Sequence, residues 1–210
     1  MSRSRPTLDV SGCLLNPQQQ PASEPLCWAA VFGNDHPVEV EIGSGKGLFV
    51  ASAGSQKPEH NYLGIELSRK YARLAAERIV TRGIGNVRVW PGDARAVLAR
   101  LVPDASVRVV HVYFPDPWWK KRHKKRRVFT ADLLASLVRV LKPSGELHVA
   151  TDVEEYFDVI RLLVGGERRF IELPAPPLKE PEHDLDYLTN FERKFRLEGR
   201  TIYRAAYGIR

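Results

Sequence analysis

The stretch VEVEIGSGKG, Val38–Gly47, joins a short strand-like run to a turn that contains three glycines. Valine and isoleucine at alternate positions predict a strand, and the glycines predict a tight turn where the backbone can approach a ligand closely. A helix-like stretch follows to about Ala53. This order is typical of the first unit of an α/β nucleotide-binding sheet. Glu39 does not fit, because it places a charge in a strand that should be buried, and the sequence supplies no partner for it.

The same order of strand and helix recurs along the chain. Further strands are predicted at Asn61–Glu66, Asn86–Trp90, Val107–Phe114, Glu146–Thr151, Arg168–Leu173 and near Arg200–Tyr207. Helices are predicted after Ser68, across Ala94–Leu101, after Thr130, and after Asp152, whose spacing to Glu155 is that of a capping box. The helix after Ser68 is predicted to turn Tyr71, Leu74, Ala75 and Ile79 toward the sheet. Five strand–helix pairs indicate an α/β fold with a mostly parallel sheet wound on both faces.

Composition limits the class of protein. The 210 residues are 43% hydrophobic and suffice for one domain, predicted at residues 25–210 after a flexible, Pro-, Gln- and Ser-rich arm at residues 1–24. We find neither an apolar run of about 18 residues, as a membrane span requires, nor a secretory signal. Cys13 and Cys27 lack the spacing of a disulfide framework or a metal site. A cytoplasmic protein without a metal is expected.

An acidic residue stands at the end of each of the first five predicted strands. In chain order these residues are Glu41, Glu66, Asp93, Asp116 and Asp152. Because ligands of open α/β sheets bind outside the carboxyl ends of the strands, the five acids should line one crevice. For Asp152 alone, a role as a helix cap explains the residue equally well.

The glycines indicate which cofactor this crevice suits. Gly43, Gly45 and Gly47 follow the pattern G-x-G-x-G, whereas a dinucleotide fold would place a glycine where Leu48 stands. Glu66 follows about twenty residues later, where an acid binds ribose hydroxyls. S-Adenosylmethionine carries a sulfonium cation and no phosphate, so acids near the turn favour it, and a nicotinamide cofactor stays open as an alternative.

The stretch FPDPWWKKRHKKRR, Phe114–Arg127, places Asp116 between two prolines that restrict the backbone on each side. One of Trp118 and Trp119 is expected to pack inside and the other to stack on a base, but the sequence does not say which. Seven of the eight residues Lys120–Arg127 are basic, in a chain of net charge +7. A solvated face or an import signal could explain this run, but its place beside Asp116 favours contact with nucleic acid.

These motifs resemble those of the tRNA (guanine-N7-)-methyltransferases of the bacterial single-chain type. The matching pieces are EIGSGKG at 41–47, GIE at 64–66, GDA at 92–94, FPDPWWKKRHKKRR at 114–127, TD at 151–152 and TNFERKF at 189–195. The resemblance implies an α/β class I S-adenosylmethionine-dependent methyltransferase (Rossmann-like) fold, with a seven-stranded sheet whose last strand is antiparallel. It also implies methyl transfer to a guanine in the variable loop of tRNA.

The resemblance further implies roles for individual residues. Asp116 is the expected active-site acid. The expected cofactor contacts are Glu41, Gly43, Gly45, Glu66, Asp93 and Asp116. The expected substrate contacts are Lys120, Asp152, Thr189, Asn190, Phe191 and Glu192. The expected RNA contacts are Arg122, His123, Lys124, Lys125, Arg126 and Arg127.

The chain departs from the family pattern in two places. Val153 stands where an aromatic residue often follows the TD pair, and the C-terminal end from Glu198 diverges, which leaves the shape of the last strand open. Two other functions also stay open, a methyltransferase for another RNA or for protein, and an RNA-binding protein without catalysis. The expected partner is tRNA, and the chain is expected to be a monomer or homodimer.

Overall fold

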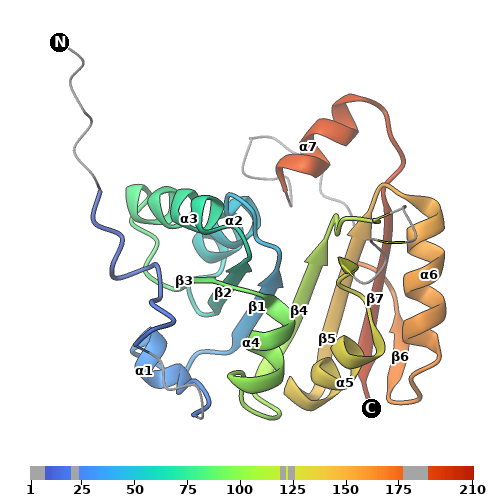
Figure 1. Cartoon of the computed structure of the whole chain (residues 1–210), viewed down its shortest axis with the longest axis horizontal. Coiled ribbons are helices and arrows are strands. Elements are labelled where there is room, and N and C mark those ends of the chain that lie inside the picture. The colour runs from blue at the N-terminus through green and yellow to red at the C-terminus, as the bar shows by residue number, and fades with distance from the viewer. Residues whose placement is uncertain (1–7, 20–23, 119–121, 123–125, 177–188) are drawn as a thin grey trace.

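A computed structural model describes residues 8–19, 24–118, 122, 126–176 and 189–210 (Figure 1). Seven strands form one sheet in the order β3-β2-β1-β4-β5-β7-β6. Their bounds are β1 Val38–Ile42, β2 Asn61–Glu66, β3 Val87–Pro91, β4 Val107–Tyr113, β5 Leu141–Thr151, β6 Phe170–Leu173 and β7 Tyr203–Ile209. Strand β7 runs antiparallel to both β5 and β6, while β1 to β5 pair in parallel. The predicted α/β fold with an antiparallel last strand is confirmed.

Among the described residues, helices α1 to α6 cover the sheet and α7 lies above its carboxyl edge (Figure 1). Their bounds are α1 Trp28–Phe32, α2 Leu48–Gln56, α3 Arg69–Thr81, α4 Ala94–Arg100, α5 Ala131–Val140, α6 Glu154–Gly165 and α7 Asn190–Leu197. Side chains of α2 and α3 form one buried cluster, and those of α1, α4, α5 and α6 form another. The sheet therefore has a hydrophobic core on each face, as a doubly wound fold requires.

Helix α3 begins as predicted but presents a different face to the sheet. The Ser68 hydroxyl accepts a hydrogen bond from the Tyr71 amide and caps the helix. The buried side chains are Ala72, Ala75, Ala76 and Ile79. The prediction was wrong for Tyr71 and Leu74, which are 43% and 37% exposed. Small side chains face inward because α3 packs so closely on the glycine-rich turn that a Cβ on Gly47 would lie 2.7 Å from the Cβ of Ala75.

The predicted capping box at the start of α6 was also wrong. The N-cap residue is Val153, and it makes no side-chain capping bond. The Asp152 carboxylate instead forms an ion pair with Arg200 in the segment before β7. Glu154 and Glu155 still occupy the first turn of α6, where the positive end of the helix dipole favours acids.

Two histidines resolve the misfit of Glu39 in β1. The Glu39 carboxylate lies 2.6 Å from Nδ1 of His60 and 2.7 Å from Nε2 of His111. The Nδ1 atom of His111 lies 2.9 Å from the Tyr113 hydroxyl, and its Nε2–H donates to Glu39. Burial alone would raise the pKa of Glu39, but the bonds and charges of His111 and His60 lower it to about 2. Glu39 is therefore a paired, buried anion.

The edge strand β3 is covered by the N-terminal segment. The Val89 amide donates to the Cys13 carbonyl, and the Leu15 amide donates to the Val89 carbonyl, each at 2.9 Å. Val10 and Cys13 are buried in the cluster under α2 and α3. Residues 10–15 therefore protect an edge that would otherwise expose unpaired backbone groups. Among the described residues, every helix is too short or too polar to cross a bilayer.

Candidate active site

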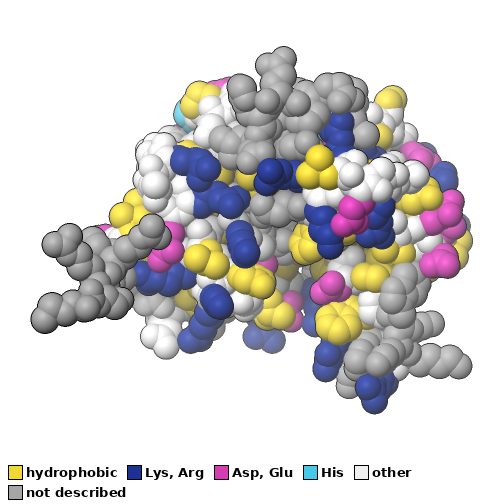
Figure 2. Space-filling view, turned by 90° about the horizontal axis from the view of Figure 1, so that it is seen from above, with side chains coloured by type: hydrophobic (Ala, Val, Ile, Leu, Met, Phe, Trp, Pro, Cys, Tyr) yellow, Lys and Arg dark blue, Asp and Glu magenta, His cyan; other side chains and the backbone are white. Residues whose placement is uncertain are grey.

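A cavity of about 980 Å³ opens at the carboxyl ends of the strands. Gly43 and Gly45 of the glycine-rich turn line it, as do residues of the PDP turn after β4 and of α7. Figure 2 looks onto this edge of the sheet and shows Lys and Arg side chains around a hollow that contains acidic and hydrophobic side chains. The position is the one at which open α/β sheets bind their ligands, and the volume suits a nucleoside-sized molecule.

Glu66 fixes the glycine-rich turn at one wall of the cavity. Its Oε2 atom accepts a hydrogen bond from the Gly45 amide and its Oε1 atom accepts one from the Ser68 amide, each at 2.8 Å. Gly43 and Gly45 have φ angles of 76° and 55°, which only glycine adopts at little cost. The turn and the carboxylate are therefore held together before any ligand binds.

Glu41 lies beneath the same turn rather than on the cavity wall. It is 2% exposed, and its Oε2 atom has no hydrogen-bond partner among the described residues. Burial raises the pKa of Glu41 to about 8, the negative charge of Glu66 adds to the shift, and the Val50 amide opposes it. An incompletely bonded acid next to Ile42 and Gly43, which do line the cavity, is suited to a hydrogen-bonding ligand.

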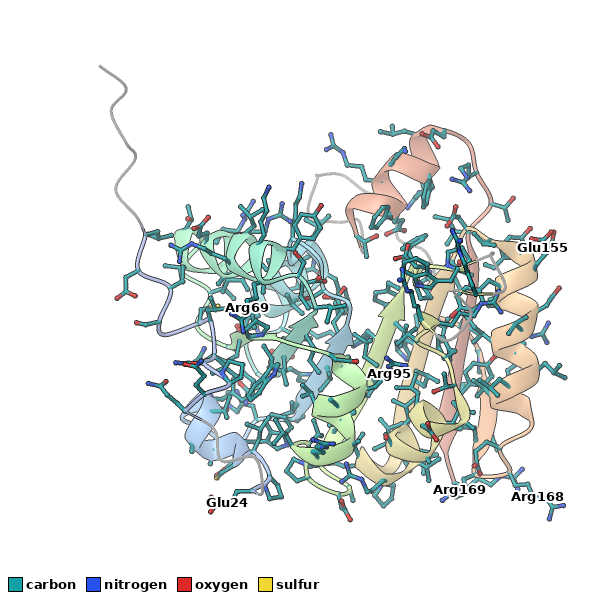
Figure 3. The ribbon with its side chains drawn as sticks, in the orientation of Figure 1. Glu24, Arg69, Arg95, Glu155, Arg168 and Arg169 are labelled. Carbon is teal, nitrogen blue, oxygen red and sulfur yellow. The ribbon has the colours of Figure 1, made fainter. Side chains whose placement is uncertain are left out.

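Asp93 lines the cavity at the end of β3 and also caps α4. Its Oδ1 atom accepts from the Arg95 amide at 2.9 Å, and its Oδ2 atom lies 3.2 Å from the Arg95 guanidinium. Partial burial would raise the pKa of Asp93, but its hydrogen bonds with Arg95 outweigh this and lower it. Asp93 therefore stays ionised with a fixed orientation, and Arg95, labelled in Figure 3, also lines the cavity.

The PDP turn carries Asp116, which is exposed and lines the cavity. Phe114 and Trp118, on either side of the turn, have φ angles of 50° and 43°. These angles are uncommon for bulky residues and persist only where the surroundings impose them. On one side the Phe114 amide donates to the Ala150 carbonyl at 2.7 Å, and on the other Arg127 Nε donates to the Pro117 carbonyl at 2.7 Å. The acid is thus carried on a turn that is anchored at both ends.

The described part of the basic run divides into two kinds of side chain. Arg122 and Arg126 are exposed, and the Arg126 guanidinium lies 5.1 Å from the centre of the Trp118 ring at the cavity. Arg127 is half-buried and lies 4.9 Å from the centre of the Tyr156 ring. Arg127 therefore supports the PDP turn. The predicted contacts Lys120, His123, Lys124 and Lys125, like Trp119, lie outside the described residues.

Helix α7 closes the cavity on the side of β5, and the sequence analysis did not predict it. Thr189 Oγ1 caps the helix by accepting from the Glu192 amide at 3.0 Å. Phe191 is 57% exposed and lines the cavity, whereas Glu192 is 2% exposed and does not. Asn190 opens the helix, but its side chain lies outside the described residues. The T-x-x-E spacing, a capping-box signal, was available in the sequence.

Arg200 ties α7 to the rest of the site. Its guanidinium pairs with Asp152, which lines the cavity, and stacks 4.2 Å from the centre of the Phe195 ring of α7. Phe195 also lies 5.6 Å from the ring of Phe114 at the PDP turn. Neither arginine contact was predicted, because Asp152 and Arg200 lie far apart in the sequence and α7, which carries Phe195, was not predicted.

The structure thus brings together most of the predicted residues that it describes. One cavity is lined by Gly43, Gly45, Glu66, Asp93, Asp116, Arg126, Asp152 and Phe191. Glu41, Thr189 and Glu192 are adjacent to its wall without forming it. Within the described residues, no group of three His, Cys, Asp or Glu side chains could hold a metal ion.

Comparison with known proteins points to one family. The sequence profile of a family described as "Putative methyltransferase" matches residues 35–205. A protein of Rhodopirellula baltica, named tRNA (guanine-N(7)-)-methyltransferase, is 42% identical over 99% of this chain and 78% of its own length. A protein of Geobacter metallireducens with the same name is 36% identical over 92% of this chain and 90% of its own.

Solved structures support the fold. The 16S rRNA methyltransferase KamB superposes with a TM-score of 0.62 at 14% identity, over 87% of this chain and 92% of its own. An S-adenosylmethionine-dependent methyltransferase from Aquifex aeolicus superposes with a TM-score of 0.58 at 13% identity, over 84% and 85% of the two chains. The chain therefore has the fold of the class I methyltransferases.

Proposed function

The chain belongs to the tRNA (guanine-N7-)-methyltransferase family, and on this premise we propose that it transfers a methyl group from S-adenosylmethionine to N7 of a guanine in the variable loop of tRNA. The observation that carries the proposal is the single cavity at the ends of β2 to β5, where Glu66, Asp93, Asp116 and Asp152 meet beside a glycine-rich turn. Acids on several strand ends suit a cationic donor with ribose hydroxyls.

The residues present fit S-adenosylmethionine. Glu66, fixed by two backbone amides, is placed to accept from the ribose hydroxyls, and the buried Glu41 carboxyl lies next to the turn with its Oε2 atom unbonded among the described residues. A dinucleotide would need the backbone amides of this turn for its pyrophosphate, but the Gly45 amide already donates to Glu66, which counts against a nicotinamide cofactor. When bound, S-adenosylmethionine supplies a methyl group on a positively charged sulfur.

The reaction requires the protein to align guanine N7 with the methyl group and does not require it to transfer a proton. Guanine N7 carries a lone pair and no proton, so no general base is needed. Holding the nucleophile in line with the methyl group can contribute about 7–11 kcal/mol in favourable cases. The purine becomes cationic as it accepts the methyl group, and a fixed carboxylate beside it stabilises that charge. Asp116, on its anchored turn, is the residue placed for this role.

The test is a site-mapped methylation assay. The purified chain is incubated with methyl-labelled S-adenosylmethionine and unmodified tRNA, and the label is located by borohydride–aniline cleavage, which is selective for N7-methylguanine. Label at a variable-loop guanine is expected. Label on another RNA or on protein, or cofactor binding without any transfer, would overturn the proposal, and calorimetry with NAD in place of S-adenosylmethionine tests the remaining alternative.

The two described arginines at the end of the basic run should separate in their effects. Arg126→Ala removes an exposed cation, so tRNA affinity should fall and the log–log salt slope should flatten by about 1 while cofactor affinity is retained. Arg127→Ala removes the donor to the Pro117 carbonyl, so the rate at saturating tRNA should fall as well. Filter binding across salt concentrations and single-turnover rates distinguish the two. If both variants changed tRNA affinity and single-turnover rate equally, the separate roles of Arg126 in tRNA contact and Arg127 in supporting the PDP turn would be contradicted.

A further inference from the structure

Helix α3 exposes apolar side chains at the rim of the cavity. Tyr71 and Leu74 are 43% and 37% exposed, and Leu67, just before the helix, is 74% exposed. Leu67 and Tyr71 also line the cavity. Exposed apolar groups that adjoin one another, rimmed by polar residues, mark interaction sites more often than isolated ones do. Tyr71 and Leu74 are the two side chains of α3 that the sequence pattern predicted to face the sheet but that are exposed.

Basic residues surround the same stripe. Lys46 precedes α2, and Arg69 and Lys70 occupy the first turn of α3, where the structure has no acid. The Lys46 ammonium lies 5.7 Å from the centre of the Tyr71 ring. Cations at a helix N-terminus are disfavoured by the helix dipole, and among the described residues neither Lys46 nor Lys70 forms an ion pair with an acidic side chain. A bound anion would offset the unfavourable interaction of these cations with the helix dipole and would give Lys46 and Lys70 a partner of opposite charge.

The patch formed by Lys46, Lys70, Tyr71 and Leu74, which we call the α3 patch, lies across the cavity opening from the basic run. Tyr71 lines the cavity from α3, while Trp118 and Arg126 line it from the segment after β4. Figure 2 shows basic side chains on both sides of the hollow. A large polyanion that reaches the cavity from outside can therefore contact both surfaces at once.

We propose that the α3 patch is a second docking surface for the tRNA substrate, with Lys46 and Lys70 contacting phosphates and Tyr71 stacking on a base or ribose. The inference rests on the proposed function and adds to it the second surface that holds the RNA over the cavity. Folded RNA offers phosphates and flat base faces together, and a patch that mixes cations with an aromatic ring matches both. An acidic protein surface would match the cations but leave the ring unexplained.

Loss of the Lys70 charge and loss of the Tyr71 ring should change tRNA binding in different ways. Lys70→Glu should weaken tRNA binding about 10-fold near 0.15 M salt and flatten the salt slope by about 1. Tyr71→Ala should weaken binding by a similar factor, about 10-fold, with the salt slope unchanged, because stacking releases no counterions. Tyr71→Phe keeps the ring and should bind like the unaltered chain. Cofactor affinity, measured by calorimetry, should be retained in all three.

Arg168→Glu provides the matched control, since it makes the same charge change at the opposite end of the molecule (Figure 3). It should leave tRNA affinity and the salt slope unchanged. Equal effects of Lys70→Glu and Arg168→Glu would overturn the inference, as would a loss of cofactor affinity in Tyr71→Ala as large as its loss of tRNA affinity. If the unaltered chain methylates tRNA while the α3 variants bind it normally, only this inference fails. If the unaltered chain does not methylate tRNA, the proposed function itself is refuted, together with the inference that rests on it.

Discussion

Asp116→Ala is expected to lower the rate of methyl transfer at saturating substrates by about 10²–10³-fold, the range found when one preorganised electrostatic group is removed from an active site. Affinity for tRNA and for S-adenosylmethionine should change much less. The physical reason is that the carboxylate stabilises a positive charge that the purine acquires only as the methyl group arrives. An interaction that strengthens during the reaction affects the rate constant rather than ground-state binding.

The conservative variant Asp116→Asn makes this test sharper. It keeps the shape of the side chain and the PDP turn but removes the charge, so its rate should fall nearly as far as that of Asp116→Ala. Asp158→Ala, an exposed acid on the outer side of α6, is the control and should retain full activity. Single-turnover rates with excess enzyme measure the chemical step directly. If Asp116→Asn keeps the unaltered rate, the charge of Asp116 is not what promotes transfer.

The parts of the site that could be predicted from the sequence are those that local rules determine. Strand β2 has the bounds predicted for it, because a short apolar run between turn residues identifies a buried strand directly. An acid at the end of a strand must lie at the carboxyl edge of a parallel sheet, so the meeting of Glu66, Asp93 and Asp116 followed from the order of the elements alone.

The parts that could not be predicted depend on contacts between distant segments. The partners of Glu39 lie 21 and 72 residues away along the chain, and no periodicity connects them. The pairing of Asp152 with Arg200 displaced a predicted helix cap for the same reason. Helix α7 is short, and a tertiary contact, the stacking of Phe195 on Arg200 and Phe114, holds it. In α3 the alanines face the core because close packing requires small side chains there.

Glu39 offers the second large effect, on stability. Glu39→Ala would leave the buried His111 and the partly buried His60 without the carboxylate that both contact, and removing one partner from a buried charged network costs about 3–5 kcal/mol in the free energy of unfolding. Glu39→Gln keeps the side-chain volume, so its smaller loss isolates the charge. Urea unfolding at pH 7 measures both. Glu172→Gln, an exposed acid on β6, is the control and should change stability little.

The pH dependence of unfolding tests whether the charge of Glu39 causes this loss of stability. Because the folded-state pKa of Glu39 is lowered to about 2, its ionised form stabilises the folded chain fully above the unfolded pKa near 4.5, and this contribution disappears as the pH falls toward 2. The shift corresponds to about 3 kcal/mol. The stability difference between the unaltered chain and Glu39→Gln should therefore be constant from pH 7 to about 5 and shrink below it.

His148 in β5 lies in the same network, and its contribution to the pH dependence of stability can be separated from that of Glu39. Burial, followed by the charge of His111, lowers the pKa of His148, and the carboxylates of Glu146 and Glu39 oppose the shift. Its neutral form is therefore favoured in the folded chain, and stability falls as the pH drops below about 6.5. That loss should occur in both chains, and only the small contribution of the Glu39 charge to it differs, so most of it cancels in their difference. A difference that stays constant down to pH 3 would show that Glu39 stabilises the sheet by packing and not as a paired anion.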